Sequence, residues 1–120
     1  MNRKNLRILA DYLESKKLKA AFSMETYSAD GESYKPNCGA VGCAIGHGPY
    51  AGIPKRVSES WDAYDTRVFG LQGEALRWCF SSRWAEIDNT PEGAAKRIRY
   101  LLEHGAPPDD FLNHRPWNKW

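Results

Sequence analysis

The sequence has few of the features that mark a secreted or membrane protein. Its three cysteines are an odd number, and Met1 to Lys4 lead into a helical pattern with no apolar stretch of the secretory type. The longest uncharged stretch that is mainly apolar, Cys38 to Ile53, is too rich in glycine to span a bilayer. We therefore expect a reduced, cytoplasmic protein with no membrane association, whose cysteines are thiols or metal ligands.

An excess of one charge is also missing. Seventeen Lys and Arg residues face fifteen Asp and Glu residues, which gives a net charge of +2 at pH 7. That charge is too small to support binding to long nucleic acid. The 120 residues, 42% of them hydrophobic, contain no internal repeat and fit one domain, residues 1–120, so a separate cofactor domain is excluded.

Apolar residues recur at helical spacing along most of the chain, and no alternating segment is long enough to require a sheet. A helix from about Lys4 to Lys17 carries one apolar stripe, made of Leu6, Leu9, Ala10 and Leu13. Further helices are predicted over Ala40–His47, Ser58–Gly70, Gln72–Phe80 and Thr90–Gly105. The predicted fold class is mainly α, a compact single domain of about five short helices, with a small β-hairpin between Phe22 and Tyr34 left open.

The last of these helices has the clearest end signals. Thr90 is a typical N-cap, Pro91 suits the first helical position, and Gly105 is a typical C-terminal stop. Its apolar stripe consists of Ala94, Ala95, Ile98, Leu101 and Leu102. The tail from Asp109 to Trp120 contains four large apolar residues, so we expect it to dock on the domain.

Cys38, Cys43 and His47 form the first candidate site. A zinc ion needs four ligands, and a second ligand pair at a signature spacing is missing. The same residues could form a Cys–His nucleophile pair, although neither an orienting group nor an oxyanion hole is visible in the sequence. The pattern favours a third interpretation, in which these are small packing residues.

The glycine-rich loop from Gly46 to Gly52 forms the second candidate, because glycine lets backbone N–H groups converge on an anion. It matches neither a Walker A loop nor a dinucleotide-binding fingerprint, and a tight connection between helices is the simpler interpretation. Two basic residues follow the loop, and arginine and aromatic residues alternate in the second half of the chain, a pattern that suits a nucleotide or a protein interface. The predicted ligand-binding residues are Gly46, His47, Gly48, Tyr50, Lys55, Arg56, Arg83, Trp84 and Arg97.

The simpler alternative for the second half is that Trp78 and Trp84 lie in the core and the arginines lie on solvated helix faces. Asp62 and Asp65 are three residues apart on a predicted helix, which is typical of a solvated face and not of a metal site. No pair of carboxylates has the spacing expected of a general acid and base, and no catalytic residue is assigned.

The segment CGAVGCAIGH at 38–47, with FGL at 69–71 and TPEGAAKRIRYL at 90–101, resembles a group of small phage and bacterial proteins. These carry a CGxxxCxxGH-type motif followed by FGL and TPExAAxRI blocks. The resemblance covers Phe22 to Leu102 and leaves both ends unmatched. It implies a phage or prophage origin and a small accessory role, and it assigns no catalytic residue.

These observations favour a protein that acts stoichiometrically. The leading hypothesis is anti-defence activity by sequestering a host signalling nucleotide in the host cytoplasm. One alternative is a protein inhibitor that covers a host protein through its aromatic and arginine surface; another is a metal-binding protein or Cys–His enzyme centred on Cys38, Cys43 and His47. Only that last alternative calls for a cofactor, zinc, and a homo-oligomer is compatible with all three.

Overall fold

The computed structural model describes residues 1–18, 21–22, 41–42, 44–81, 84 and 87–108. The elements in this part of the chain are α1 (Arg3–Glu14), β1 (Ala21–Phe22), β2 (Val41–Gly42), the 3-10 helix η1 (Ile45–His47), α2 (Trp61–Val68), α3 (Gly73–Phe80) and α4 (Pro91–His104). The mainly α class is thus confirmed. The radius of gyration, 13.2 Å, is close to the ~13–14 Å expected for a folded chain of this length.

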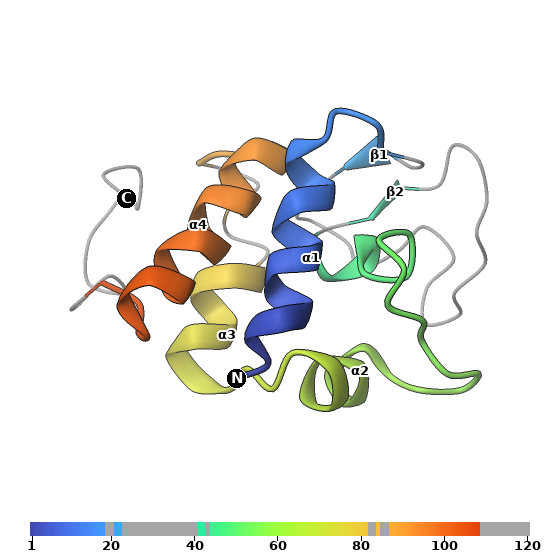
Figure 1. Ribbon diagram of the computed structural model, residues 1–120. Coiled ribbons are helices and arrows are strands. Elements are labelled where there is room, and N and C mark those ends of the chain that lie inside the picture. The colour runs from blue at the N-terminus through green and yellow to red at the C-terminus, as the bar shows by residue number, and fades with distance from the viewer. Residues whose placement is uncertain (19–20, 23–40, 43, 82–83, 85–86, 109–120) are drawn as a thin grey trace.

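Helices α1 and α4 lie side by side in opposite directions (Figure 1). Near the start of α1, Arg3 donates to the carbonyl oxygen of Leu102, 2.6 Å away. Near its end, Arg99 of α4 binds both carboxylate oxygens of Glu14, at 2.9 and 2.6 Å. The stripe predicted for α1 is fully buried, which confirms that part of the prediction: Leu6, Leu9, Ala10 and Leu13.

The termini of α4 are also as predicted. The Thr90 hydroxyl accepts the Gly93 N–H at 3.0 Å, and Pro91 opens the helix. Gly105 ends it with φ of 78°, and its N–H donates to the Leu101 carbonyl at 2.8 Å. A left-handed residue at this position favours glycine, so the sequence signal has a direct backbone cause.

Helices α2 and α3 bring aromatic side chains into the core. Ser60 caps α2 by accepting the Ala63 N–H at 3.1 Å. Trp61 and Tyr64 are buried along one side of α2, and Trp78 of α3 is buried, as in the simpler interpretation of the second half of the chain. Edge-on ring contacts join these aromatic residues to one another and to their neighbours, at centroid distances of 5.3–5.9 Å.

The helix predicted over Ala40–His47 is wrong. Val41–Gly42 is extended and pairs in parallel with Ala21–Phe22, and only Ile45–His47 is helical, as one 3-10 turn. Glycine is a poor helix former, so pairing with β1 can hold this backbone in an extended form. The predicted hairpin lies almost wholly outside the described residues, and so does the predicted docking of the tail after Pro108.

Candidate functional site

The glycine-rich loop after η1 uses its backbone donors within itself. Five N–H groups donate to carbonyls of residues 44–49 at 3.0–3.3 Å: those of His47, Gly48, Ala51, Gly52 and Ile53. An anion would have to compete with these bonds, because a cradle for an anion needs N–H groups that are not yet used. The loop therefore has the geometry of the alternative interpretation, a compact connection.

Close packing explains one of the glycines in this loop. A Cβ atom at Gly48 would overlap the hydroxyl group of Tyr64 and approach its ring at 3.0 Å. That hydroxyl donates to the Ile53 carbonyl, so Tyr64 cannot move away without losing a buried hydrogen bond. Gly48 is needed for contact between the loop and α2.

His47 is a core residue. Its side chain is buried, and its ring lies 5.7–6.0 Å from the rings of Tyr12, Phe22 and Tyr50. These rings come from α1, β1 and the loop, so His47 joins three segments of the fold. Tyr50 is half-buried in the same group.

The two basic residues after the loop lie in the segment that leads to α2. The Lys55 ammonium lies 5.2 Å from the ring centre of Trp61, within cation–π range. Arg56 is exposed, and its backbone N–H donates to a carboxylate oxygen of Glu59 at 3.0 Å. Both residues are therefore placed by contacts with α2 or with the turn before it.

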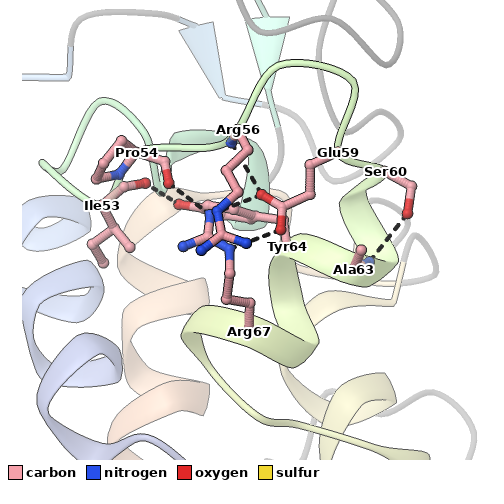
Figure 2. Close-up of polar contacts among 8 residues, drawn as sticks. All are labelled: Ile53, Pro54, Arg56, Glu59, Ser60, Ala63, Tyr64 and Arg67. Carbon is pink, nitrogen blue, oxygen red and sulfur yellow. Dashed lines mark hydrogen bonds and ion pairs between the residues drawn. The ribbon is translucent and has the colours of Figure 1, made fainter.

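Glu59 is fixed in turn by Arg67 of α2 (Figure 2). Nε and Nη2 of Arg67 each donate to one carboxylate oxygen at 2.8 Å, and Nη2 also donates to the Pro54 carbonyl at 3.0 Å. The guanidinium of Arg67 lowers the pKa of Glu59 to about 2, against the opposing effect of burial, because its hydrogen bonds stabilise the charged carboxylate. We call these contacts of Pro54, Glu59 and Arg67 the Arg67 clamp.

Two predicted residues from the second half of the chain do meet. The guanidinium of Arg97 lies 4.2 Å from the ring centre of Trp84, in cation–π contact. Trp84 is buried and donates from Nε1 to the Arg77 carbonyl at 3.3 Å. Arg97 is only 4% exposed, although the alternative interpretation placed the arginines on solvated faces.

One edge of the Arg97 guanidinium is left without acceptors. Nε and Nη2 are both buried, and neither has a hydrogen-bond partner among the described residues. Burial lowers the pKa of Arg97 to about 10, with Asp88 and Cys79 acting in the opposite direction, so the group stays a cation at neutral pH. A buried charge with unused donors is costly, which makes this edge the most unusual feature of the described structure.

The structure does not bring all the predicted ligand-binding residues together. In Figure 1, the loop after η1 and helix α4 lie on opposite sides of α1. Among these residues, the described contacts join Arg97 to Trp84 and to none of Gly46, His47 and Gly48, and the joint anion site stays a prediction. Arg83 lies outside the described residues.

Sequence reasoning missed the buried carboxyl of Asp65. It is only 2% exposed, and Oδ1 has no hydrogen-bond partner among the described residues. Burial raises its pKa to about 7, Asp62 adds to the rise, and a hydrogen bond from the Leu71 backbone opposes it. The expectation that this residue lies on a solvated face is therefore wrong; its position four residues after Trp61, on the side of α2 that faces the core, was the available signal.

The described residues contain no group of three or more His, Cys, Asp or Glu side chains that could hold a metal ion. Cys79 is buried and free, and burial raises the pKa of its thiol. Cys38 and Cys43 lie outside the described residues, so the predicted zinc and Cys–His sites stay predictions. Within the described part of the chain, each helix is too short or too polar to cross a lipid bilayer.

Comparison with protein-family models, with curated proteins and with solved structures finds no match for this chain. The resemblance of residues 38–47, 69–71 and 90–101 to small phage and bacterial proteins therefore stays a prediction.

Proposed function

We propose that the protein acts stoichiometrically by binding an anionic small molecule of the nucleotide type, with Arg97 as the residue that holds the anion. The observation that carries the proposal is the buried Nε/Nη2 edge of Arg97, which has no acceptor among the described residues. Buried donors in folded proteins nearly always have a partner, and a bound anion would supply one.

Two other arginines of the chain support this choice of ligand. Arg67 and Arg99 use the same edge, Nε with Nη2, to hold both oxygens of one carboxylate, on Glu59 and Glu14. A phosphate or carboxylate group of a ligand offers the same two-oxygen arrangement to Arg97. The negative charge of Asp88 acts on Arg97, but Asp88 does not bind this edge, since neither Nε nor Nη2 has a hydrogen-bond partner among the described residues. Asp88 instead accepts a hydrogen bond from Thr90 at 2.6 Å.

Trp84 positions the guanidinium in this proposal. Because Arg97 already covers one face of the indole, that face is not available to a stacked base. Recognition at Arg97 would therefore depend on the phosphate more than on the base. Sequestering a host signalling nucleotide, the anti-defence role expected above, would use this contact in a protein with no catalytic residue assigned.

Calorimetry on the full chain tests the proposal. The titrants are cyclic di- and trinucleotides, ADP-ribose and inorganic phosphate, added to the wild type, to Arg97→Lys and to Arg77→Met. Lysine keeps the charge but lacks the two-donor edge, so we expect a nucleotide to bind the wild type at micromolar concentration and Arg97→Lys at least tenfold more weakly. Arg77 is exposed on α3 and serves as the control, with wild-type affinity expected.

The proposal fails if no nucleotide binds the wild type at tens of micromolar, or if a folded Arg97→Lys protein binds equally well. Circular dichroism of each variant establishes that it is folded. Elemental analysis of the same preparation tests the alternative of a zinc protein, because stoichiometric zinc would favour a site at Cys38, Cys43 and His47.

A further inference from the structure

The turn that precedes α2 presents an apolar side chain to solvent. Val57 is 96% exposed. Among the described residues, Met1, at 47%, is the other exposed large hydrophobic residue. Residues 56–59 form a tight turn, closed by the Glu59 N–H donating to the Arg56 carbonyl at 3.1 Å. Its third residue, Ser58, has φ of 66°, a left-handed conformation that favours glycine.

This turn is held rigidly. The side chain of Glu59 accepts the Arg56 N–H, so hydrogen bonds cross the turn in both directions. The Arg67 clamp then fixes Glu59 to α2 and to the Pro54 carbonyl (Figure 2). Glu59 is only 8% exposed, so most of a carboxylate is buried in order to hold a turn whose tip lies in water. Strain and rigidity at an exposed tip are features that binding loops share.

The charges beside the tip indicate which partner fits it. Exposed Arg56 precedes Val57, and Lys55 precedes Arg56. We propose that residues 55–58 are a recognition turn for a protein segment that offers a small apolar pocket with carboxylates at its rim. Val57 enters the pocket, and the exposed Arg56 side chain pairs with the carboxylates. A single valine is too small an apolar group to hold a lipid surface, so a protein partner is favoured over a membrane.

This surface is separate from the proposed anion site. Residues 55–58 join η1 to α2, whereas Arg97 lies in α4 on the other side of α1 (Figure 1). The recognition turn therefore does not depend on the proposed function, and either proposal can fail while the other stands.

Selection from a displayed library of random dodecapeptides tests the recognition turn. The wild type is the bait, and selected peptides are then titrated against Val57→Asp, Arg56→Glu and the control Lys96→Glu. Lys96→Glu makes the same charge change as Arg56→Glu on an exposed position of α4. We expect the selected peptides to combine Asp or Glu with apolar residues, and to bind Val57→Asp and Arg56→Glu at least tenfold more weakly than the wild type and the control.

A variant of the clamp tests the role of rigidity. Glu59→Gln keeps Val57 and Arg56 but removes the charge that holds Arg67, so we expect the same peptides to dissociate several-fold faster. The recognition turn is overturned if no peptide is enriched, or if enriched peptides bind Val57→Asp as well as they bind the wild type. It is also overturned if vesicles with anionic lipids bind the wild type and do not bind Val57→Asp.

Discussion

At the scale of single residues, side chains that lie deep in the fold limit what their neighbours can be. Gly48 and Tyr64 show this most directly, because the phenol occupies the space where a Cβ of residue 48 would lie. The Tyr64 hydroxyl is also committed to the Ile53 carbonyl. The pair therefore behaves as one unit, and replacing either residue changes the cost of replacing the other.

Gly48→Ala is expected to lower the free energy of unfolding by about 1–3 kcal/mol through overpacking. Tyr64→Phe removes the hydroxyl and its hydrogen bond, and we expect it to cost about 1–3 kcal/mol alone. Because Tyr64→Phe removes the hydroxyl, which makes the shortest contact with the new methyl group, the double variant should cost less than the sum of the two. Urea denaturation of the four proteins measures this coupling, and strictly additive values would contradict the packing described here.

At the scale of elements, the C-terminus of α1 lacks the residue that its backbone favours. The helix ends at Glu14 with Ser15 as its C-cap, and Lys16 follows with φ of 60°, a left-handed conformation. The left-handed residue after α4 is Gly105, with φ of 78°. Both helices are thus followed by a left-handed residue, which is glycine after α4 and lysine after α1.

Lys16→Gly is expected to raise the free energy of unfolding by about 0.5–1 kcal/mol, because the strain removed exceeds the added freedom of the unfolded chain. Thermal and urea denaturation measure this change. Lys17→Gly is the matched control, since Lys17 does not have positive φ, and it should bring no gain. Equal effects of the two substitutions would show that backbone strain at Lys16 is not the cause.

The same scale shows what could be predicted from the sequence. The helices were predictable where a local signal fixes them, such as Thr90 and Pro91 at the start of α4 or the stripe beginning at Leu6. Small residues at 38–48 favour close packing in a helix and in a strand alike. The pairing of β2 with β1 could therefore not be predicted from the sequence. Arg97 and Trp84 were both predicted as ligand-binding residues, but their direct contact was not predicted. The burial of Arg97 depends on how α3 and α4 pack together, which the sequence does not give.

At the scale of the whole molecule, two buried carboxyls act on stability in opposite pH ranges. The pKa of Asp65, about 7 when folded, lies above its ordinary value of 3.8, so folding takes up protons between these pH values and stability falls as the pH rises. The pKa of Glu59, about 2 when folded, lies below its ordinary value of 4.5, so its contribution is lost as the pH falls through that range. Together these two groups favour the folded state most near pH 4–5.

Asp65→Asn should remove the loss of stability toward neutral pH. We expect the free energy of unfolding of the variant, minus that of the wild type, to rise by about 1–3 kcal/mol between pH 4.5 and 8. Urea denaturation across this range measures the difference. Asp62→Asn replaces an exposed carboxyl on the same helix and should keep most of the wild-type slope. A difference that stays constant with pH would show that Asp65 titrates normally in the folded protein.

The antiparallel pairing of α1 with α4 also bears on how the chain is made. The ion pair of Glu14 with Arg99 joins residues 85 positions apart, and the bond from Arg3 to Leu102 joins residues 99 apart. A nascent α1 leaving the ribosome cannot pack against α4 until nearly all of the described chain has been translated. Contacts this distant slow folding, so the stripe is exposed to chaperones and to aggregation during synthesis.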